Sequence, residues 1–171
     1  AGIIPAADAL LGLPNVIRTR TFSKAYGLAG SRIGYVIAAE DTARAFDKIR
    51  NHFGLNRIGV AAAIAALKDQ AYLRSVLEKI AAARMRIGAI TEANGLVPLA
   101  SATNFVTVDC GRDGVFARAI VDGLMEEGVF IRMPGVAPLN RCIRISVGPQ
   151  AEMDLLEKAL PKVLAQLQRA P

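Results

Sequence analysis

The residues best suited to chemistry gather between positions 21 and 32. Lys24 follows a segment that favours a strand, Ser23 and Thr21 place hydroxyls one and three residues before it, and Arg32 follows eight residues later. A lysine amine can bond an aldehyde as a Schiff base, and hydroxyl and guanidinium groups hold phosphate through charge-assisted hydrogen bonds. The spacing is therefore compatible with a lysine that carries a phosphorylated aldehyde. A solvated loop lysine beside a common glycine turn is the alternative interpretation.

The elements that must position these residues have the pattern of a strand, a tight loop and a second strand. Residues 15–21 alternate β-branched and basic residues and predict a strand, and residues 33–38 form an apolar run of strand length. A short helix is expected over residues 6–12. Asp41 is a candidate N-cap for a helix to about residue 51. The alanine-rich residues 58–68 predict a further helix.

The rest of the chain predicts a small α/β layer. A long amphipathic helix begins at Gln70 and ends at the Asn94–Gly95 pair, which is a favourable C-cap. The patterns that follow indicate β-α-β-β-α, a set that can bury its own core. The expected elements are a strand at 104–109, a helix at 114–127, strands at 129–132 and 142–147, and a helix at 150–168.

Composition excludes several classes of protein. The chain has 171 residues, is 53% hydrophobic and carries a net charge of +6. Its basic residues are spread along the sequence and tryptophan is absent, so nucleic-acid binding is not expected. No apolar run approaches the roughly 20 residues that span a bilayer, so no membrane partner is expected. Cys110 and Cys142 stand alone, which argues against a metal site or a disulfide framework and favours the cytoplasm.

Residues 21–35, TFSKAYGLAGSRIGY, closely resemble the lysine segment of class I/II aminotransferases of fold type I, most of all the histidinol-phosphate aminotransferase branch. The resemblance implies that Lys24 forms the internal aldimine with pyridoxal 5′-phosphate. It implies that Ser23 and Arg32 bind the cofactor phosphate and that Thr21 offers a second hydroxyl to it. The implied activity transfers an amino group between an amino acid, or an amino-alcohol phosphate, and a 2-oxo acid, with Lys24 as general base.

A second resemblance lies downstream. Residues 140–148, NRCIRISVG, are similar to the family strand whose arginine grips the substrate α-carboxylate, which implies this role for Arg144. Without the upstream match, an outward arginine on an alternating strand would be the preferred interpretation. Arg132, in GVFIRMPG, resembles a family arginine that faces the distal group of the substrate. Asn104, in SATNF, matches a position that bonds backbone or substrate, and the structural role is favoured.

The resemblance covers nearly the whole chain but only about the second half of a typical family member. It implies an α/β fold in which residues 1–69 form the C-terminal part of the cofactor-binding large domain, with its mixed sheet. Residues 70–171 would form the small substrate-side domain of β-α-β-β-α type. The family also implies a homodimer. A decarboxylase or lyase of the same fold, and a catalytically silent fragment without its N-terminal half, remain alternatives.

Overall fold

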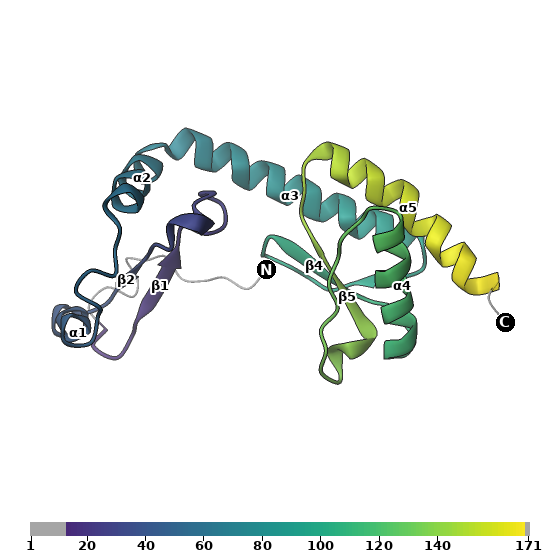
Figure 1. Cartoon of the computed structure of the whole chain (residues 1–171), viewed down its shortest axis with the longest axis horizontal. Coiled ribbons are helices and arrows are strands. Elements are labelled where there is room, and N and C mark those ends of the chain that lie inside the picture. Colours follow the sequence, from purple (N-terminus) through teal and green to yellow (C-terminus); the bar gives the residue numbers. More distant parts are fainter. Residues whose placement is uncertain (1–12, 170–171) are drawn as a thin grey trace. The chain divides into compact units, whose positions relative to one another are not determined.

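The computed structural model describes residues 13–169, so the helix expected over residues 6–12 lies outside the described part. The chain divides into two compact units, one up to Leu77 and one from Glu78 onward. The longest helix, α3 (Gln70–Ala93), contributes residues to both units (Figure 1). Each unit is described by itself below.

The first unit is built on an antiparallel pair of strands, β1 (Arg18–Thr21) and β2 (Gly34–Ile37). Both strands were expected, and both are shorter than the sequence pattern. The register pairs Arg18 with Ile37 and Thr21 with Gly34. Gly34 must be glycine, because a Cβ there would lie 2.6 Å from the carbonyl oxygen of Arg20. The pairing therefore brings the two ends of the candidate lysine loop together.

The helices of this unit correct one expectation and confirm another. Helix α1 (Glu40–Ala45) begins one residue before Asp41, with Ala39 as its N-cap, and a 3₁₀ turn over Phe46–Lys48 follows it. The carboxylate of Asp41 therefore lies in the first turn, where the helix dipole still favours a negative charge. Helix α2 (Arg57–Lys68) follows the alanine-rich segment, and the side chain of Asn56 caps it.

The core of the first unit is small. Among residues 13–77, its buried apolar cluster consists of Phe22, Ile33 and Ala63. Other large apolar groups lie in solvent, among them Phe53 at 96% and Ile58 at 85% of their full exposure. Because burial of apolar surface supplies most of the stabilisation of a fold, this unit has little to hold it together.

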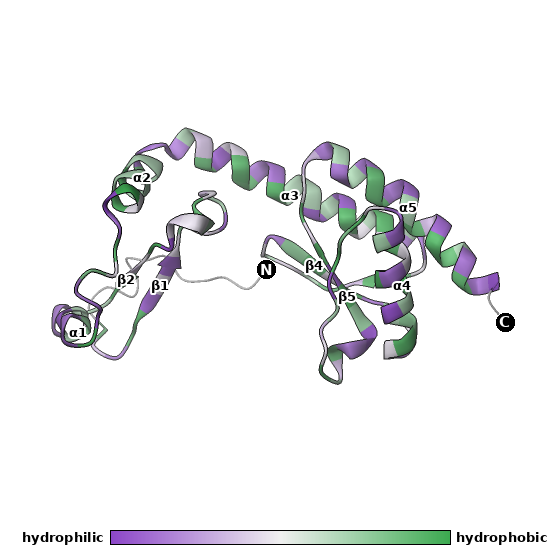
Figure 2. Ribbon diagram, in the orientation of Figure 1, coloured by the Kyte–Doolittle hydropathy of each residue, from purple (hydrophilic) through white to green (hydrophobic). Residues whose placement is uncertain are grey.

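The second unit is an antiparallel sheet covered by helices. Its strands lie in the order β3-β4-β5, and α4 packs against both β5 and α5 (Figure 1). The elements are β3 (Val97–Pro98), β4 (Phe105–Asp109), α4 (Gly114–Glu126), β5 (Cys142–Ser146) and α5 (Gln150–Arg169). Figure 2 shows hydrophobic and hydrophilic residues alternating along α3 and α5, as expected of amphipathic helices.

A continuous core stabilises this unit. One face of the sheet joins it through Val106, Val108, Ile143 and Ile145, and the helices add Leu124, Leu156 and Leu160, all of them buried. Helices α4 and α5 approach closely at Gly123, where a Cβ would lie 2.7 Å from Cγ1 of Val163. The second unit therefore closes its own core, as the sequence pattern predicted.

One expected strand is absent, and one strand was not expected. Residues 129–132 do not form a strand, and only Arg132 forms an isolated bridge, to Arg144 of β5. Pro134 has no N–H to donate, so the ladder cannot extend past the bridge in that direction. The short strand β3 was not anticipated. It pairs with β4 through Val97 and Pro98, and Val97 is held in extended conformation by the proline that follows it.

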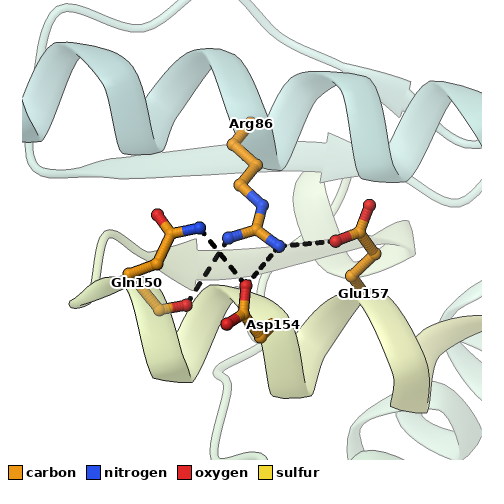
Figure 3. Close-up of polar contacts among 4 residues, drawn as sticks. All are labelled: Arg86, Gln150, Asp154 and Glu157. Atoms are coloured by element: carbon orange, nitrogen blue, oxygen red, sulfur yellow. Dashed lines mark hydrogen bonds and ion pairs between the residues drawn. The ribbon is translucent and has the colours of Figure 1, made fainter.

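Polar contacts join α5 to the second half of α3. Arg86 donates to Glu157 and Asp154, with nitrogen–oxygen distances of 2.5 and 2.6 Å, and it reaches the carbonyl oxygen of Gln150 at 3.5 Å (Figure 3). The hydrogen bonds to Glu157 and Asp154 raise the pKa of Arg86. The end of α3 is as predicted, because Gly95 adopts φ +75° directly after Asn94.

The unequal cores lead to a prediction for the isolated chain. We expect amides of β4, β5, α4 and α5 to exchange with solvent only through global unfolding of the second unit. We expect those of β1, β2 and α1 to exchange orders of magnitude faster, because little apolar surface is lost when they open. Hydrogen exchange followed by mass spectrometry measures both groups in one sample. Equal protection of both units in a monomer would contradict the expectation.

Candidate functional site

The predicted lysine loop begins where β1 ends. The backbone N–H of Ser23 donates to Oγ1 of Thr21 at 3.0 Å, so the two hydroxyl residues are held in one local turn. Lys24 opens the next turn, and its carbonyl oxygen accepts from the N–H of Gly27 at 2.8 Å. Gly27 has φ +71°, which a side chain would strain. The side chain of Lys24 is exposed and makes no hydrogen bond or ion pair within residues 13–169.

Arg32 closes the loop in an unusual conformation. Its φ of 52° is left-handed, and no other residue with a side chain between positions 13 and 169 has a positive φ. Holding a residue other than glycine in this backbone conformation costs about 1–3 kcal/mol. Such residues cluster at active sites and ligand-binding sites, where the surrounding structure offsets the cost. Its Nη1 donates to the carbonyl oxygen of Ala29 at 2.9 Å. That bond leaves most of the guanidinium donors free for a ligand.

Contacts of Phe22 and Asn56 that sequence reasoning missed hold this loop to its surroundings. The N–H of Phe22 donates to the carbonyl oxygen of Ile33 at 3.2 Å, and the Phe22 ring packs beside Tyr26 and Tyr35, with centroids 4.9 and 5.7 Å away. Asn56 caps α2 and also donates from Nδ2 to the carbonyl oxygen of Ser31 at 3.0 Å. An asparagine before a helical pattern signals a cap, but not this second contact.

The second unit brings two predicted arginines together. Arg132 and Arg144 exchange two backbone hydrogen bonds, at 3.1 and 2.6 Å, and β4 places Thr107 opposite Arg144 on its other side. Residues directly opposite one another in an antiparallel pair project from the same face. All three side chains therefore lie on the face of the sheet opposite Val106 and Ile145, which face the core.

Arg144 is half-buried, and no carboxylate of residues 13–169 forms an ion pair with it. Its Cζ lies 4.8 Å from the centroid of the Phe105 ring, and its buried Nε has no hydrogen-bond partner among the same residues. Its neighbour Arg141 is different, because it forms an ion pair with Asp109. The N–H of Gly111 and then Arg141 lower the pKa of Asp109, so that carboxylate is committed to its own contacts. The arrangement leaves Arg144 able to bind an anion from outside.

The remaining predicted residue has a structural contact. The carbonyl oxygen of Asn104 accepts from the N–H of Val147 at 3.0 Å, which continues the pairing of β4 and β5. No hydrogen bond of its side chain occurs in the described part of the chain, so the structural role stays the simpler interpretation. The lysine loop lies in the first unit, whereas Asn104 and the two arginines lie in the second.

Other chemistry finds no support in the described residues. Cys110 and Cys142 are buried and free, and burial raises the pKa of Cys110 to about 11. Such a thiol is protonated near neutrality and a poor nucleophile. Residues 13–169 contain no cluster of three or more side chains suited to a metal ion, and none of their helices is long and apolar enough to cross a membrane.

Comparison with known proteins identifies the family of this chain. The sequence profile of "Aminotransferase class I and II" matches residues 5–161. Histidinol-phosphate aminotransferase 2 of Methylococcus capsulatus is 41% identical over 151 residues, which are 88% of this chain and 40% of that protein. Histidinol-phosphate aminotransferase of Shouchella clausii is 36% identical over 95% of this chain and 44% of its own length.

Solved structures agree with the sequence comparison. The histidinol-phosphate aminotransferase of Sinorhizobium meliloti, in complex with pyridoxal 5′-phosphate, matches with a TM-score of 0.90 and 68% identity, over 95% of this chain and 45% of that one. The L-threonine-O-3-phosphate decarboxylase of Porphyromonas gingivalis, at 22% identity and a TM-score of 0.78, shares the fold. The chain spans less than half the length of each of the three histidinol-phosphate aminotransferases. It belongs to the class I and II aminotransferase family.

Proposed function

We propose that this chain is the lysine-bearing part of a pyridoxal 5′-phosphate-dependent aminotransferase. It would act in transfer of an amino group between an amino acid, or an amino-alcohol phosphate such as histidinol phosphate, and a 2-oxo acid. The observation that carries the proposal is the loop of residues 21–32. There an unpaired lysine follows two hydroxyls, and an arginine is held in a strained conformation. The relatives named for histidinol phosphate support the amino-alcohol phosphate as substrate.

The donors in this loop fit the proposed cofactor. Ser23, Thr21 and Arg32 offer hydroxyl and guanidinium groups, which suit the three oxygens of a phosphate. Lys24 offers an exposed amine without a competing carboxylate in the described residues. Pyridoxal 5′-phosphate, when bound, supplies the electron sink for breaking a bond at the substrate Cα. Lys24 would move the proton from that carbon, acting as general base and then as general acid.

The sheet face of the second unit that carries Arg144 and Arg132 offers cationic groups for anions of the substrate. Arg144 would bind the α-carboxylate through its planar fork, and Arg132, on the same face, would meet a second anionic group. Asn104 would act through the backbone contact that joins β4 to β5, and a contact to substrate is the alternative role. We keep the division of the chain into a cofactor side, residues 1–69, and a substrate side, residues 70–171, as part of the proposal.

The partners and location follow from the same proposal. We infer a homodimer, as the resemblance to the family implies. Exposed apolar side chains of the first unit, such as Phe53 and Ile58, would then pack against the rest of the protein or against the second copy. A complete protein that sediments as a single copy would contradict this inference. Free, buried cysteines support a reducing cytoplasm. Amino acids and 2-oxo acids remain the proposed substrates.

Two substitutions test the proposal by separating cofactor from substrate. In the complete enzyme, Arg32→Ala should weaken cofactor affinity by about 1.5–3 kcal/mol, because a hydrogen bond between charged groups is lost. Arg144→Ala should leave cofactor affinity unchanged and raise the amino-acid concentration that gives half-maximal rate. Arg57→Ala, an exposed arginine at the start of α2, is the control and should change neither.

The two readouts are the cofactor absorbance during titration and the initial rate against amino-acid concentration. If Arg32→Ala binds cofactor as tightly as the parent protein, Arg32 does not hold the phosphate. If Arg144→Ala titrates with amino acid as the parent does, while the protein stays folded, Arg144 is only an outward strand residue.

A further inference from the structure

The ring of Phe105 lies against the guanidinium of Arg144. The ring centroid and Cζ are 4.8 Å apart, well inside the range of a cation–π contact. The register explains the proximity, because Thr107 lies opposite Arg144 and Phe105 is two residues earlier on the same strand. Phe105 is thus the diagonal neighbour of Arg144 on the same face, within reach of a long side chain.

Phe105 is itself fixed by the turn that precedes β4. Its carbonyl oxygen accepts from Oγ of Ser101 at 2.5 Å and from Oγ1 of Thr103 at 3.1 Å. Its N–H donates to Oγ1 of Thr103 at 3.3 Å. Three hydrogen bonds from one short turn therefore hold the backbone of the aromatic residue at the point where the strand begins.

A ring holds Arg144 without using up its donors. An arginine can be ordered by a carboxylate, as Asp109 orders Arg141, but that contact occupies the N–H groups that a ligand needs. The ring of Phe105 has no lone pairs, so it limits the rotamers of Arg144 while the fork stays free. The buried Nε of Arg144, which has no partner in the described residues, is consistent with this arrangement.

Core packing alone does not account for the position of Phe105. The residue is half-buried, and it projects from the face opposite the buried Val106. It does not belong to the buried core cluster of the second unit. Arg132 flanks Arg144 on the other side and carries the same charge, so attraction from that side cannot hold the guanidinium.

We propose that Phe105 is a positioning residue, which holds the guanidinium of Arg144 ready to receive a carboxylate. This inference rests on the carboxylate-binding role proposed above for Arg144. It adds that the affinity of the enzyme for amino acid depends on an aromatic ring at position 105, and that the ring acts only through Arg144.

The test compares Phe105→Leu, Phe105→Tyr and Arg144→Ala in the complete enzyme. Phe105→Leu should raise the KM for amino acid about 3–10-fold, with kcat and cofactor affinity little changed, because an exposed or partly desolvated cation–π contact is lost. Phe105→Tyr keeps a ring and should stay within about twofold of the parent. In the Arg144→Ala background, Phe105→Leu should have no further effect, because the ring then has nothing to position.

Phe116→Leu is the matched control. The Phe116 ring lies 4.3 Å from Cζ of Arg112, a second arginine–ring pair of the same unit, and it packs against the core, on the side opposite the face of Arg144. Replacing the Phe116 ring by leucine should leave the KM for amino acid unchanged. In the 171-residue chain itself, ¹⁵N NMR should show the Nε–H signal of Arg144 in the parent and in Phe105→Tyr, and lose it to exchange in Phe105→Leu.

The outcomes separate this inference from the function on which it rests. If Arg144→Ala raises KM but Phe105→Leu does not, the positioning role is wrong and the proposed function stands. If neither variant changes KM, the carboxylate role of Arg144 is wrong. If Phe105→Leu raises KM equally with and without Arg144, the ring acts on the substrate or the fold, and the inference is overturned.

Discussion

Lys24→Ala is expected to lower the rate of amino-group transfer at least about 10²–10⁴-fold, the contribution of a positioned general base. The loss should be larger still, because the same amine is the proposed attachment point of the cofactor. No other described residue of the loop between Thr21 and Arg32 offers an amine. The measurement is the single-turnover rate of the complete enzyme with saturating cofactor and amino acid.

Lys48 is the matched control for this prediction, since it is also exposed and in the first unit. Lys48→Ala should retain the parent rate. Borohydride treatment of the cofactor-loaded protein should attach the pyridoxyl group to Lys24, and mass spectrometry identifies the labelled residue. A label on another lysine, together with an active Lys24→Ala variant, would remove Lys24 from the mechanism.

Leu160→Ala is expected to cost about 2–5 kcal/mol of the free energy of unfolding, because it removes buried methyl groups and leaves a cavity. Leu160 is completely buried, at 0% exposure, between α5 and the rest of the core of the second unit. Most domains are stable by only about 5–15 kcal/mol, so this loss is severe. Urea denaturation of the 171-residue chain, monitored by far-UV circular dichroism, measures it.

Leu155→Ala provides the comparison on the same helix. In Leu155, 42% of the surface is exposed, so its replacement should cost well under 1.5 kcal/mol, the scale of fully burying such a side chain. Equal losses for the two variants would mean that α5 is rotated about its axis relative to the structure. A small loss for Leu160→Ala would mean that the core closes around the cavity.

The long helices could be predicted because their signals are local. The apolar spacing along α3 and α5 repeats over many residues, and Asn94–Gly95 marks one end by chain conformation alone. The lysine loop was equally accessible, since Lys24 and Arg32 are close in sequence and their spacing is part of a recognisable segment. Local signals therefore predicted the long helices and the lysine loop, although the local cap signal at Asp41 misplaced the start of α1 by one residue.

What could not be predicted depends on contacts between distant segments. The bond from Asn56 to Ser31 spans 25 residues, and the pairing of Arg132 with Arg144 depends on a register that neither segment specifies alone. The left-handed φ of Arg32 was also invisible, because arginine has no intrinsic preference for that region. Pattern reasoning treated residues 129–132 as a strand because it cannot know that only one of them finds a partner.

The close approach of α4 and α5 at Gly123 has a consequence for how sequences of this kind can diverge. A Cβ at position 123 and the branched side chain of Val163 compete for one space, so the two positions share a fixed volume. Alanine can then replace Gly123 only in a protein that already has a smaller side chain than valine at position 163. Side-chain volumes at these two sites should accordingly covary inversely among family members, although 40 residues separate them in the chain.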